Sequence, residues 1–408
     1  MPSTERLYYH DSFLYGFDAT VLECAERGGR PAVVLDRTAF YPTSGGQVHD
    51  TGMIVLEDET QMPVVEVAEE EDGRIYHFTS APAALAPGLR IRGRIDSARR
   101  RDHMQQHSGQ HVLSAAFVHL FDVPTASFHM GAESCTIDLT AKSLDGKQII
   151  QAERLANEII TEDRSVKISF VSLDEAQRLG VRKLPPKQTG DLRLIDIADF
   201  DLTACGGTHV RSTGQIGSIL VRKTENVKQG VRVEFVCGMR AVSTARQDYM
   251  TLTETAALLS THIRELPQQV GKTIQEAKSA GKVQQKLLEE IAELRAAEML
   301  AHATGSPKVI VSVFPERDAA FIKLLAQKLT AAAPDVIALL ASGAGQAAVV
   351  FAQSPGQKHN MGQLMKDAMA KLNGRGGGTA DMAQGGLPAG AVDLAQIEKL
   401  LREMAGNL

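Results

Sequence analysis

Short apolar runs separated by turn-forming residues dominate the first 95 residues of the chain. Runs such as Ala32–Leu35 and Pro63–Val67 are rich in valine and other aliphatic residues, and glycines such as Gly28 and Gly29 stand between them. Apolar runs of this length with glycine and aspartate at their ends are typical of antiparallel strands. We therefore predict an N-terminal β-barrel domain over residues 1–95.

The pattern becomes a mixture of helices and strands from about residue 96. Between Asp102 and Leu120, apolar and histidine residues recur at spacings of three and four, which predicts a helix. A second helix is expected from about Lys147 to Glu162, and the run Val166–Val171 reads as a strand. This alternation predicts an α+β domain over residues 96–240.

Helix-forming residues fill the segment 241–303 almost completely. We expect two helices, broken near Pro267 and Gly271, that pair as an antiparallel hairpin or coiled-coil linker. The second helix carries an apolar stripe at spacings of four, four and three. The stripe consists of Val283, Leu287, Ile291 and Leu294. Such a segment acts as a spacer or as the contact between two copies of a chain.

A compact α/β domain is predicted over residues 304–408, after the boundary Gly305–Pro307. Strand-like runs alternate there with helical segments such as Met361–Leu372. We expect the following segment, Gly374–Gly378, to be a glycine-rich loop. It is either a cradle for a phosphate group or a plain flexible connection. The whole chain is thus predicted to be an α+β multidomain protein.

Composition narrows the class of protein and its location. Hydrophobic residues make up 43% of the 408 residues, which is usual for a globular protein. The sequence has no apolar run of membrane-spanning length, and its first residues, Met1–Ser12, lack the apolar core of a signal peptide. We therefore expect a cytoplasmic protein.

Charge and cysteine content limit the chemistry. The net charge of −5 means that a nucleic-acid partner requires local basic patches. Arg99, Arg100 and Arg101 form one such patch, which we interpret as a phosphate-binding cluster, the alternative being an ordinary solvated face. The four cysteines are widely spread, so a disulfide framework is not expected and a metal or catalytic role for one of them is.

Two short motifs suggest a metal site. His107 and His111 are four residues apart, so that both rings share one face of the predicted helix, although two structural histidines are an equal alternative. Cys205 and His209 are also four apart, with two glycines between them; the alternative there is a glycine turn beside a buried cysteine. Together the four residues form a ligand set typical of zinc.

The function of such a zinc ion stays open at this point. Four protein ligands close a zinc site, whereas catalysis needs an open position. Ser108 occupies the position that a glutamate base has in the H-E-x-x-H motif, so a zinc protease of that kind is excluded.

The two motifs resemble the zinc motifs of the alanyl-tRNA editing family AlaX, which is similar to the editing domain of alanyl-tRNA synthetase. The glycine-rich segment Phe40–Gln47, followed by Asp50 and Gly52, resembles a third motif of the family. Near the C-terminus, Asp381–Gly386 resembles the DHHA1 domain of the synthetase. The resemblance covers nearly the whole chain in order and indicates the long form of the family.

This resemblance implies hydrolysis, in trans, of the ester that joins serine or glycine to tRNA for alanine, with no ligase activity. It implies one zinc ion per chain and identifies Gln47 and Thr125 as catalytic residues, with Ser127 as the alternative sensor of the serine hydroxyl. The implied ligands are His107, His111, Cys205 and His209, and the implied pocket residues are Ser44, Gly45, Gly46 and Gln47. The competing interpretation is a non-catalytic tRNA-binding module with a structural zinc.

Overall fold

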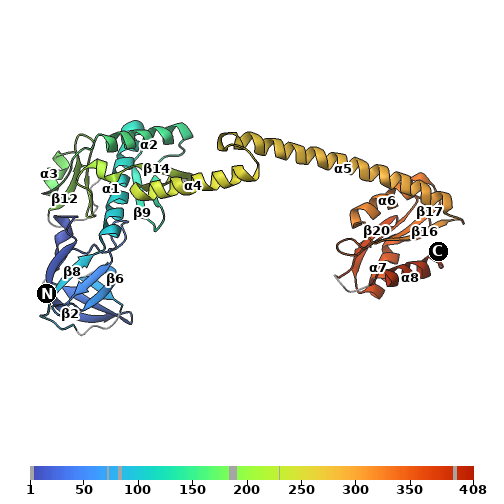
Figure 1. The fold of residues 1–408 in the computed structure, drawn as a ribbon, viewed down its shortest axis with the longest axis horizontal. Coiled ribbons are helices and arrows are strands. Elements are labelled where there is room, and N and C mark those ends of the chain that lie inside the picture. Colours follow the sequence, from blue (N-terminus) through green and yellow to red (C-terminus); the bar gives the residue numbers. More distant parts are fainter. Residues whose placement is uncertain (1–3, 71–72, 81–84, 183–190, 229, 389–392) are drawn as a thin grey trace. The chain divides into compact units, whose positions relative to one another are not determined.

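The chain forms two compact units, which Figure 1 shows in a computed structural model. The first spans Met1–Glu254 and the second Thr255–Leu408. The structure describes all residues except 1–3, 71–72, 81–84, 183–190, 229 and 389–392. No helix in the described part of the chain is both long and apolar enough to cross a membrane. The predicted α+β multidomain architecture is confirmed.

The N-terminal strands close into the predicted barrel, which has six strands. In hydrogen-bonded order these are β2 (Gly16–Arg27), β3 (Arg30–Leu35), β7 (Ile75–Thr79), β6 (Gln61–Glu69), β5 (Gly52–Val55) and β8 (Arg90–Ile95). Burial along β8 alternates, so that Ile91 and Ile95 face the apolar interior while the arginines between them face solvent. Two short strands, β1 (Glu5–Arg6) and β4 (Arg37–Thr38), pair beside the barrel.

A long helix, α1 (Ser97–Phe121), follows the barrel and is the central element of the first unit. It begins where the Asp96 side chain accepts hydrogen bonds from the N–H groups of Ala98 and Arg99. It ends at Asp122, which adopts the left-handed conformation with φ of 55°. The middle of α1 is buried on nearly all sides, which explains how histidines on it come to lie away from solvent.

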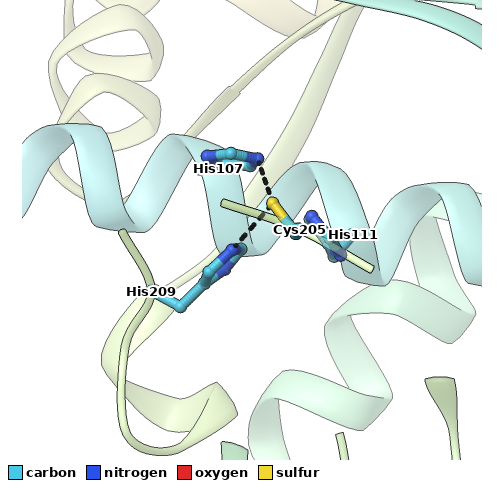
Figure 2. A group of neighbouring side chains, drawn as sticks. All are labelled: His107, His111, Cys205 and His209. Atoms are coloured by element: carbon cyan, nitrogen blue, oxygen red, sulfur yellow. Dashed lines mark hydrogen bonds between the residues drawn. The ribbon is translucent and has the colours of Figure 1, made fainter. Parts of the chain in front are cut away.

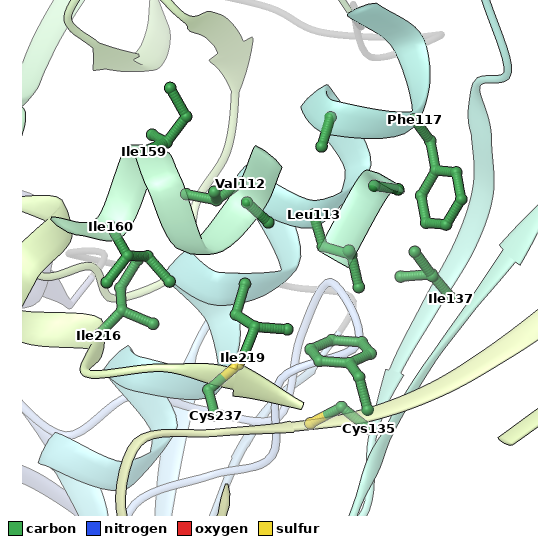
Figure 3. Close-up of a cluster of buried hydrophobic side chains, with 14 of the residues drawn as sticks. Val112, Leu113, Phe117, Cys135, Ile137, Ile159, Ile160, Ile216, Ile219 and Cys237 are labelled. Atoms are coloured by element: carbon green, nitrogen blue, oxygen red, sulfur yellow. The ribbon is translucent and has the colours of Figure 1, made fainter. Parts of the chain in front are cut away.

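Two antiparallel sheets and the helix α2 surround α1. The first sheet contains, in order, β14 (Ile219–Val227), β15 (Gly230–Cys237), β10 (Cys135–Leu139) and β9 (Thr125–Met130). The second contains β11 (Val166–Val171), β12 (Leu192–Ile197) and β13 (Asp201–Ala204). Apolar side chains of α1 pack between the first sheet and α2 (Gly146–Thr161), as Figure 3 shows. The short α3 (Leu173–Arg178) precedes β12, and α4 (Gly238–Leu258) follows β15.

The second unit is an α/β domain built on a five-stranded sheet. Its strands are, in order, β16 (Lys308–Phe314), β17 (Val336–Ser342), β18 (Ala348–Gln353), β20 (Met382–Gly386) and β19 (Arg375–Gly378). The long α5 (Leu266–His302) and α6 (Ala319–Ala332) share one apolar core with the sheet. The helices α7 (Met361–Leu372) and α8 (Leu394–Ala405) share another, so the sheet is covered on both faces.

Two details differ from the sequence-based expectation. Residues 259–265 separate α4 from α5, so the first helix ends earlier than predicted. The helix α5 then runs without interruption through Pro267 and Gly271. Proline is accepted there because it occupies the first turn, where a backbone N–H has no partner within the helix. The predicted pairing of the two helices stays a prediction.

The segment Gly374–Gly378 is also not a loop, because Arg375–Gly378 forms the edge strand β19. A Cβ atom on Gly378 would lie 2.2 Å from the carbonyl oxygen of Met382, so only glycine permits the strand to approach β20 so closely.

Candidate metal centre

Four side chains from two distant segments meet at one point inside the first unit (Figure 2). His107 and His111 come from α1, whereas Cys205 and His209 come from the loop that follows β13. Their ligand atoms all lie within 4.8 Å of one another. The Sγ atom of Cys205 lies 3.4 Å from Nε2 of His107 and 3.3 Å from Nε2 of His209. The two motifs identified in the sequence therefore converge.

Glycines permit the close approach of the loop and the helix. A Cβ atom on Gly207 would lie 2.1 Å from Cε1 of His107, so a side chain at that position would collide with the ring. On the other side of the helix, a Cβ atom on Gly109 would lie 2.3 Å from Sγ of Cys237 in β15. The absence of both side chains lets α1 lie directly between the loop and the sheet.

Two of the three imidazoles are oriented by a group on the outer nitrogen. Nδ1 of His107 lies 2.7 Å from Oε1 of Gln47, and Nδ1 of His209 lies 3.2 Å from Oγ of Ser108. Both rings consequently present Nε2 to the sulfur. Such groups beside a metal-binding histidine fix its tautomer and its orientation.

The third imidazole faces a buried carboxylate. Nδ1 of His111 lies 3.8 Å from Oδ2 of Asp201, which is an ion-pair rather than a hydrogen-bond distance. Asp201 is itself held by Arg182, whose Nε donates to Oδ1 at 2.6 Å and whose Nη2 donates to Oδ2 at 2.9 Å. A carboxylate behind a histidine raises the basicity of that histidine toward a metal.

The electrostatics of Cys205 and His209 favour the forms that bind metal. Burial would lower the pKa of His111, but Cys205 and Asp201 beside it raise that pKa. Burial alone would raise the pKa of the Cys205 thiol, but the charges of His107, His209 and His111 hold it well below its usual value. Burial also lowers the pKa of His209 to about 3, so that this ring is neutral near pH 7. A thiolate and neutral imidazoles are the protonation states in which these side chains coordinate zinc.

The geometry agrees with a zinc ion. Zinc bonds of about 2.3 Å to sulfur and 2.0–2.1 Å to nitrogen, arranged tetrahedrally, place a sulfur and a nitrogen ligand roughly 3.5 Å apart. The two sulfur–nitrogen distances of 3.4 and 3.3 Å are close to that value. One sulfur and three imidazole nitrogens also match the donor types that zinc prefers. The residues present therefore fit a zinc ion.

The glycine-rich motif forms a tight turn beside the centre. Ser44 and Gln47 exchange two backbone hydrogen bonds of 3.0 and 2.9 Å across Gly45 and Gly46, whose φ angles of 57° and 84° suit the two central positions of a type I′ turn. A Cβ atom on Gly46 would lie 2.4 Å from the carbonyl oxygen of Phe128. The Phe128 ring in turn stacks on His107, with ring centroids 5.3 Å apart.

Within this turn the predicted pocket residues differ in exposure. Ser44 and Gly45 are exposed and Gly46 is half-buried, whereas Gln47 is fully buried. Gln47 contacts His107 rather than open space, so it orients this ring, and its predicted catalytic role stays a prediction.

The three consecutive arginines separate into different environments. Arg100 is fully buried, donates to both carboxylate oxygens of Asp50 and also donates to the carbonyl oxygens of Ser12 and Ala39. A guanidinium without exposed surface does not meet a phosphate in this arrangement, so a substrate-binding role of Arg100 stays a prediction that its burial does not support. Arg99 is half-buried and Arg101 is exposed, so these two remain candidates.

A β-bulge separates the two candidate hydroxyl sensors. In the pairing of β9 with β10, Ser127 lies opposite Asp138 and Thr125 opposite Leu139, which leaves Ala126 as an extra residue. Ser127 consequently donates to Oδ2 of Asp138 at 2.8 Å on the exposed side. Thr125 instead donates to Oγ of Ser114 on α1 at 2.7 Å, so it is the residue that faces the helix carrying the ligands.

Sequence reasoning missed several residues that build the centre. Ser108 was noted only as the absence of a glutamate, yet its Oγ contacts His209 and accepts from the N–H of Val210. Phe128 and Asp201 carried no signal, because a lone aromatic or acidic residue in a strand is common.

Three family models match separate parts of the chain. The class II tRNA synthetase (A) model matches residues 6–99, and the model of the second additional domain of threonyl and alanyl tRNA synthetases matches residues 192–233. The DHHA1 domain model matches residues 306–407.

Curated relatives extend over most of the chain. The alanyl-tRNA editing protein AlaX-L of Pyrococcus horikoshii is 32% identical over 392 residues, which cover 94% of this chain and 95% of that protein. The alanine–tRNA ligase of Pyrococcus furiosus is 36% identical over 73% of this chain and 33% of the ligase. The corresponding ligase of Pyrococcus abyssi is 33% identical over 94% of this chain and 42% of the ligase. The chain thus spans about a third to two fifths of the length of these ligases.

Proposed function

Since the chain belongs to the alanyl-tRNA editing family AlaX, in its long form, we propose that it is a trans-acting, zinc-dependent deacylase of tRNA for alanine that carries serine or glycine. The observation that carries this proposal is the convergence of His107, His111, Cys205 and His209 on one buried point. This point lies beside the glycine-rich turn and the strand β9. We expect no ligase activity.

The four ligands would hold one zinc ion, which when bound supplies Lewis-acid polarisation of the ester and orients the amino acid and the terminal ribose. The chain's own residues keep this centre dry and fixed. Phe128 covers one face of His107, and Gln47 and Ser108 hold the outer nitrogens of two rings. An aminoacyl ester is labile, so positioning alone contributes strongly to its hydrolysis.

Selectivity for serine would come from the hydroxyl of Thr125. Oγ of Ser114 accepts hydrogen bonds from both Thr125 and Nε2 of Gln110, at 2.7 and 2.8 Å. The proton of Thr125 is thereby occupied, and its oxygen stays available to accept a hydrogen bond from a serine side chain. A site that binds a hydroxyl in this way disfavours an analogue that lacks it, so correctly charged alanine is spared and glycine should be removed more slowly than serine.

Arg99 and Arg101 are the proposed contacts to the tRNA backbone. Both lie in the first two turns of α1, about two turns before His107, and their side chains reach the surface at least in part. Phosphate contacts from arginine position a nucleic acid without reading its sequence. The net charge of −5 makes such a local cluster necessary for RNA binding.

We further propose that two copies of the chain pair through α5. The stripe Val283, Leu287, Ile291 and Leu294 is 39% to 73% exposed, which is unusual for a row of large aliphatic residues. Lysines predominate in α5 up to residue 286, and glutamates predominate from residue 289 onward. An antiparallel pair of helices that cross at Leu288 brings Lys286 opposite Glu290 and Lys278 opposite Glu298 of the other copy. This charge complementarity favours a second copy as the partner.

The enzymatic proposal is tested by timing the hydrolysis of Ser-, Gly- and Ala-charged tRNA for alanine, with Ser-charged tRNA for serine as the specificity control. We expect rapid loss of serine and slow loss of alanine. Cys205→Ala should slow the reaction by more than the roughly 10- to 100-fold caused by losing a residue that merely orients a ligand. Cys24→Ala is the matched control, because Cys24 is an exposed cysteine outside the centre.

Undiminished hydrolysis by Cys205→Ala would refute the zinc-dependent mechanism. The second candidate function, a non-catalytic tRNA-binding module, is favoured by the four protein ligands, since closed zinc sites are typically structural. It predicts tRNA binding without hydrolysis by the wild-type protein, and unfolding when the zinc is removed.

A further inference from the structure

Gln47 joins three parts of the first unit through one buried amide. Its Oε1 accepts hydrogen bonds from Nδ1 of His107 at 2.7 Å and from the backbone N–H of Thr208 at 3.1 Å. Its Nε2 donates to Oγ1 of Thr208 at 2.9 Å. Gln47 comes from the turn between barrel strands, His107 from α1 and Thr208 from the ligand loop. The amide is therefore the place where these three segments are held together.

The hydrogen-bond pattern fixes the orientation of the amide and the tautomer of His107. The backbone N–H of Thr208 can only donate, so the amide atom that faces it must be the oxygen. The same oxygen faces Nδ1 of His107, which must then carry a proton. The lone pair of the ring is consequently on Nε2, the atom that lies 3.4 Å from the sulfur of Cys205. Gln47 thus selects the tautomer that a metal requires.

The position of Gln47 depends on how the barrel side docks onto α1 and β9. The N–H of Met130 donates to the carbonyl oxygen of Gly46 at 2.9 Å, which seats the turn on β9. Three residues beyond Gln47, the buried ion pair of Asp50 with Arg100 ties the same segment to α1. Any movement of the segment away from α1 would withdraw the amide oxygen from His107.

We propose that Gln47 is a positioning residue that couples the docking of the glycine-rich turn to metal binding. The inference rests on the metal centre of the proposed function and adds a thermodynamic link to it. Because linkage is reciprocal, a seated turn raises the affinity of the centre for zinc, and bound zinc holds the turn in place by the same free energy. The glycine-rich motif is then part of the metal centre although it supplies no ligand.

The first test compares zinc affinities measured by competition with a chromophoric chelator. Gln47→Leu removes the acceptor and should weaken zinc binding by about 10- to 100-fold. Gln47→Glu keeps an oxygen acceptor for both N–H groups, and the Thr208 hydroxyl can turn to donate to it. This variant should bind within about threefold of the wild type, or more tightly, as carboxylate–histidine pairs do at zinc sites.

The matched control is Gln106→Leu. Gln106 is equally buried and also bridges α1 to another element, since its amide exchanges two hydrogen bonds with the backbone of Cys237 at 3.0 and 2.8 Å. The hydrogen bonds of its side chain in the described part of the chain go to Asp102, Cys135 and Cys237, none of which is a candidate ligand. We expect Gln106→Leu to lower the stability of the protein without changing its zinc affinity. The comparison with Gln47→Leu then distinguishes the effect of losing a buried amide from the effect of losing the contact to His107.

The second test measures amide hydrogen exchange in residues 43–50 with and without zinc. Zinc should slow the exchange of this segment in the wild type and in Gln47→Glu, and should have no such effect in Gln47→Leu. The inference would be overturned if Gln47→Leu bound zinc as tightly as the wild type. It would also be overturned if Gln47→Leu and Gln47→Glu lost the same amount of zinc affinity. Either result would leave the proposed function standing. A wild-type protein that binds no zinc would overturn both.

Discussion

At the scale of single residues, the candidate metal centre requires that Gly207 has no Cβ atom. The nearest atoms to a Cβ at this position are Cε1 and Nδ1 of His107, at 2.1 and 2.4 Å, and Oε1 of Gln47, at 2.9 Å. A methyl group would therefore strike both partners of the hydrogen bond that orients His107. Neighbouring Gly206 has space around it, because the closest atom to its Cβ would be the Tyr9 hydroxyl at 3.4 Å.

Gly207→Ala is accordingly expected to destabilise the first unit by about 1–3 kcal/mol, the usual effect of forcing an extra methyl group into a packed site. It should also weaken zinc binding, because His107 must move. Gly206→Ala is the matched control and should change neither property measurably. Thermal unfolding and zinc titration of the two variants check this. Equal behaviour of the two alanine variants would contradict the role assigned to the contact.

The four candidate ligands could be predicted from the sequence, because spacings of four bring each pair together locally and the donor types match one metal. The residues that orient them could not. Gln47 and Thr208 are 161 positions apart, and nothing in the sequence around either of them indicates that they meet. The burial of Arg100 was equally invisible, because its two arginine neighbours are not buried and the three look alike in the sequence.

At the scale of elements, apolar periodicity predicted the helices and strands well where it is regular. Helix α7 has the predicted bounds, Met361–Leu372, because an asparagine cap begins it and a left-handed asparagine ends it. Periodicity failed for β19, where four residues contain three glycines and no side chain to show a pattern. The bulge at Ala126 was also unpredictable, since it depends on pairing with β10 rather than on local sequence.

The edge strand β19 offers a test of this close packing. Gly378→Ala places a methyl group 2.2 Å from the carbonyl oxygen of Met382 and 2.5 Å from Cα of Ala383, both of which belong to the backbone and cannot move aside cheaply. We expect it to destabilise the second unit by about 1–3 kcal/mol. At Gly377 nothing lies within 4 Å, so Gly377→Ala should stay within about 0.5 kcal/mol of the wild type.

Differential scanning calorimetry of the two variants measures the effect. If Gly377→Ala and Gly378→Ala shift the unfolding temperature of the second unit equally, the close contact between β19 and β20 is contradicted.

At the scale of the whole molecule, the proposed pairing through α5 concerns only the second unit, which carries that helix. Burial of a leucine side chain contributes roughly 1.5–3 kcal/mol, whereas an exposed ion pair contributes at most about 1 kcal/mol. The apolar stripe should therefore supply the affinity, and the charges should select the antiparallel direction.

Leu287→Glu is expected to shift the protein from dimer to monomer in sedimentation equilibrium. Leu258→Glu is the control, because Leu258 is 86% exposed but lies on α4 outside the stripe. Lys286→Glu should weaken the dimer, and adding Glu290→Lys should restore it, since the swapped charges again face each other in an antiparallel pair. A wild-type protein that is monomeric at high concentration would exclude this contact.

The distance along the chain between the two halves of the metal centre has a consequence for biosynthesis. His107 and Cys205 are 98 residues apart, and a ribosome adds about 5–20 residues per second. The nascent polypeptide therefore carries its paired imidazoles for roughly 5 to 20 s before the thiol that completes the set has been translated. During that interval the finished barrel can already hold α1 through the buried ion pair of Asp50 with Arg100, so the N-terminal domain can serve as a template for what is synthesised after it.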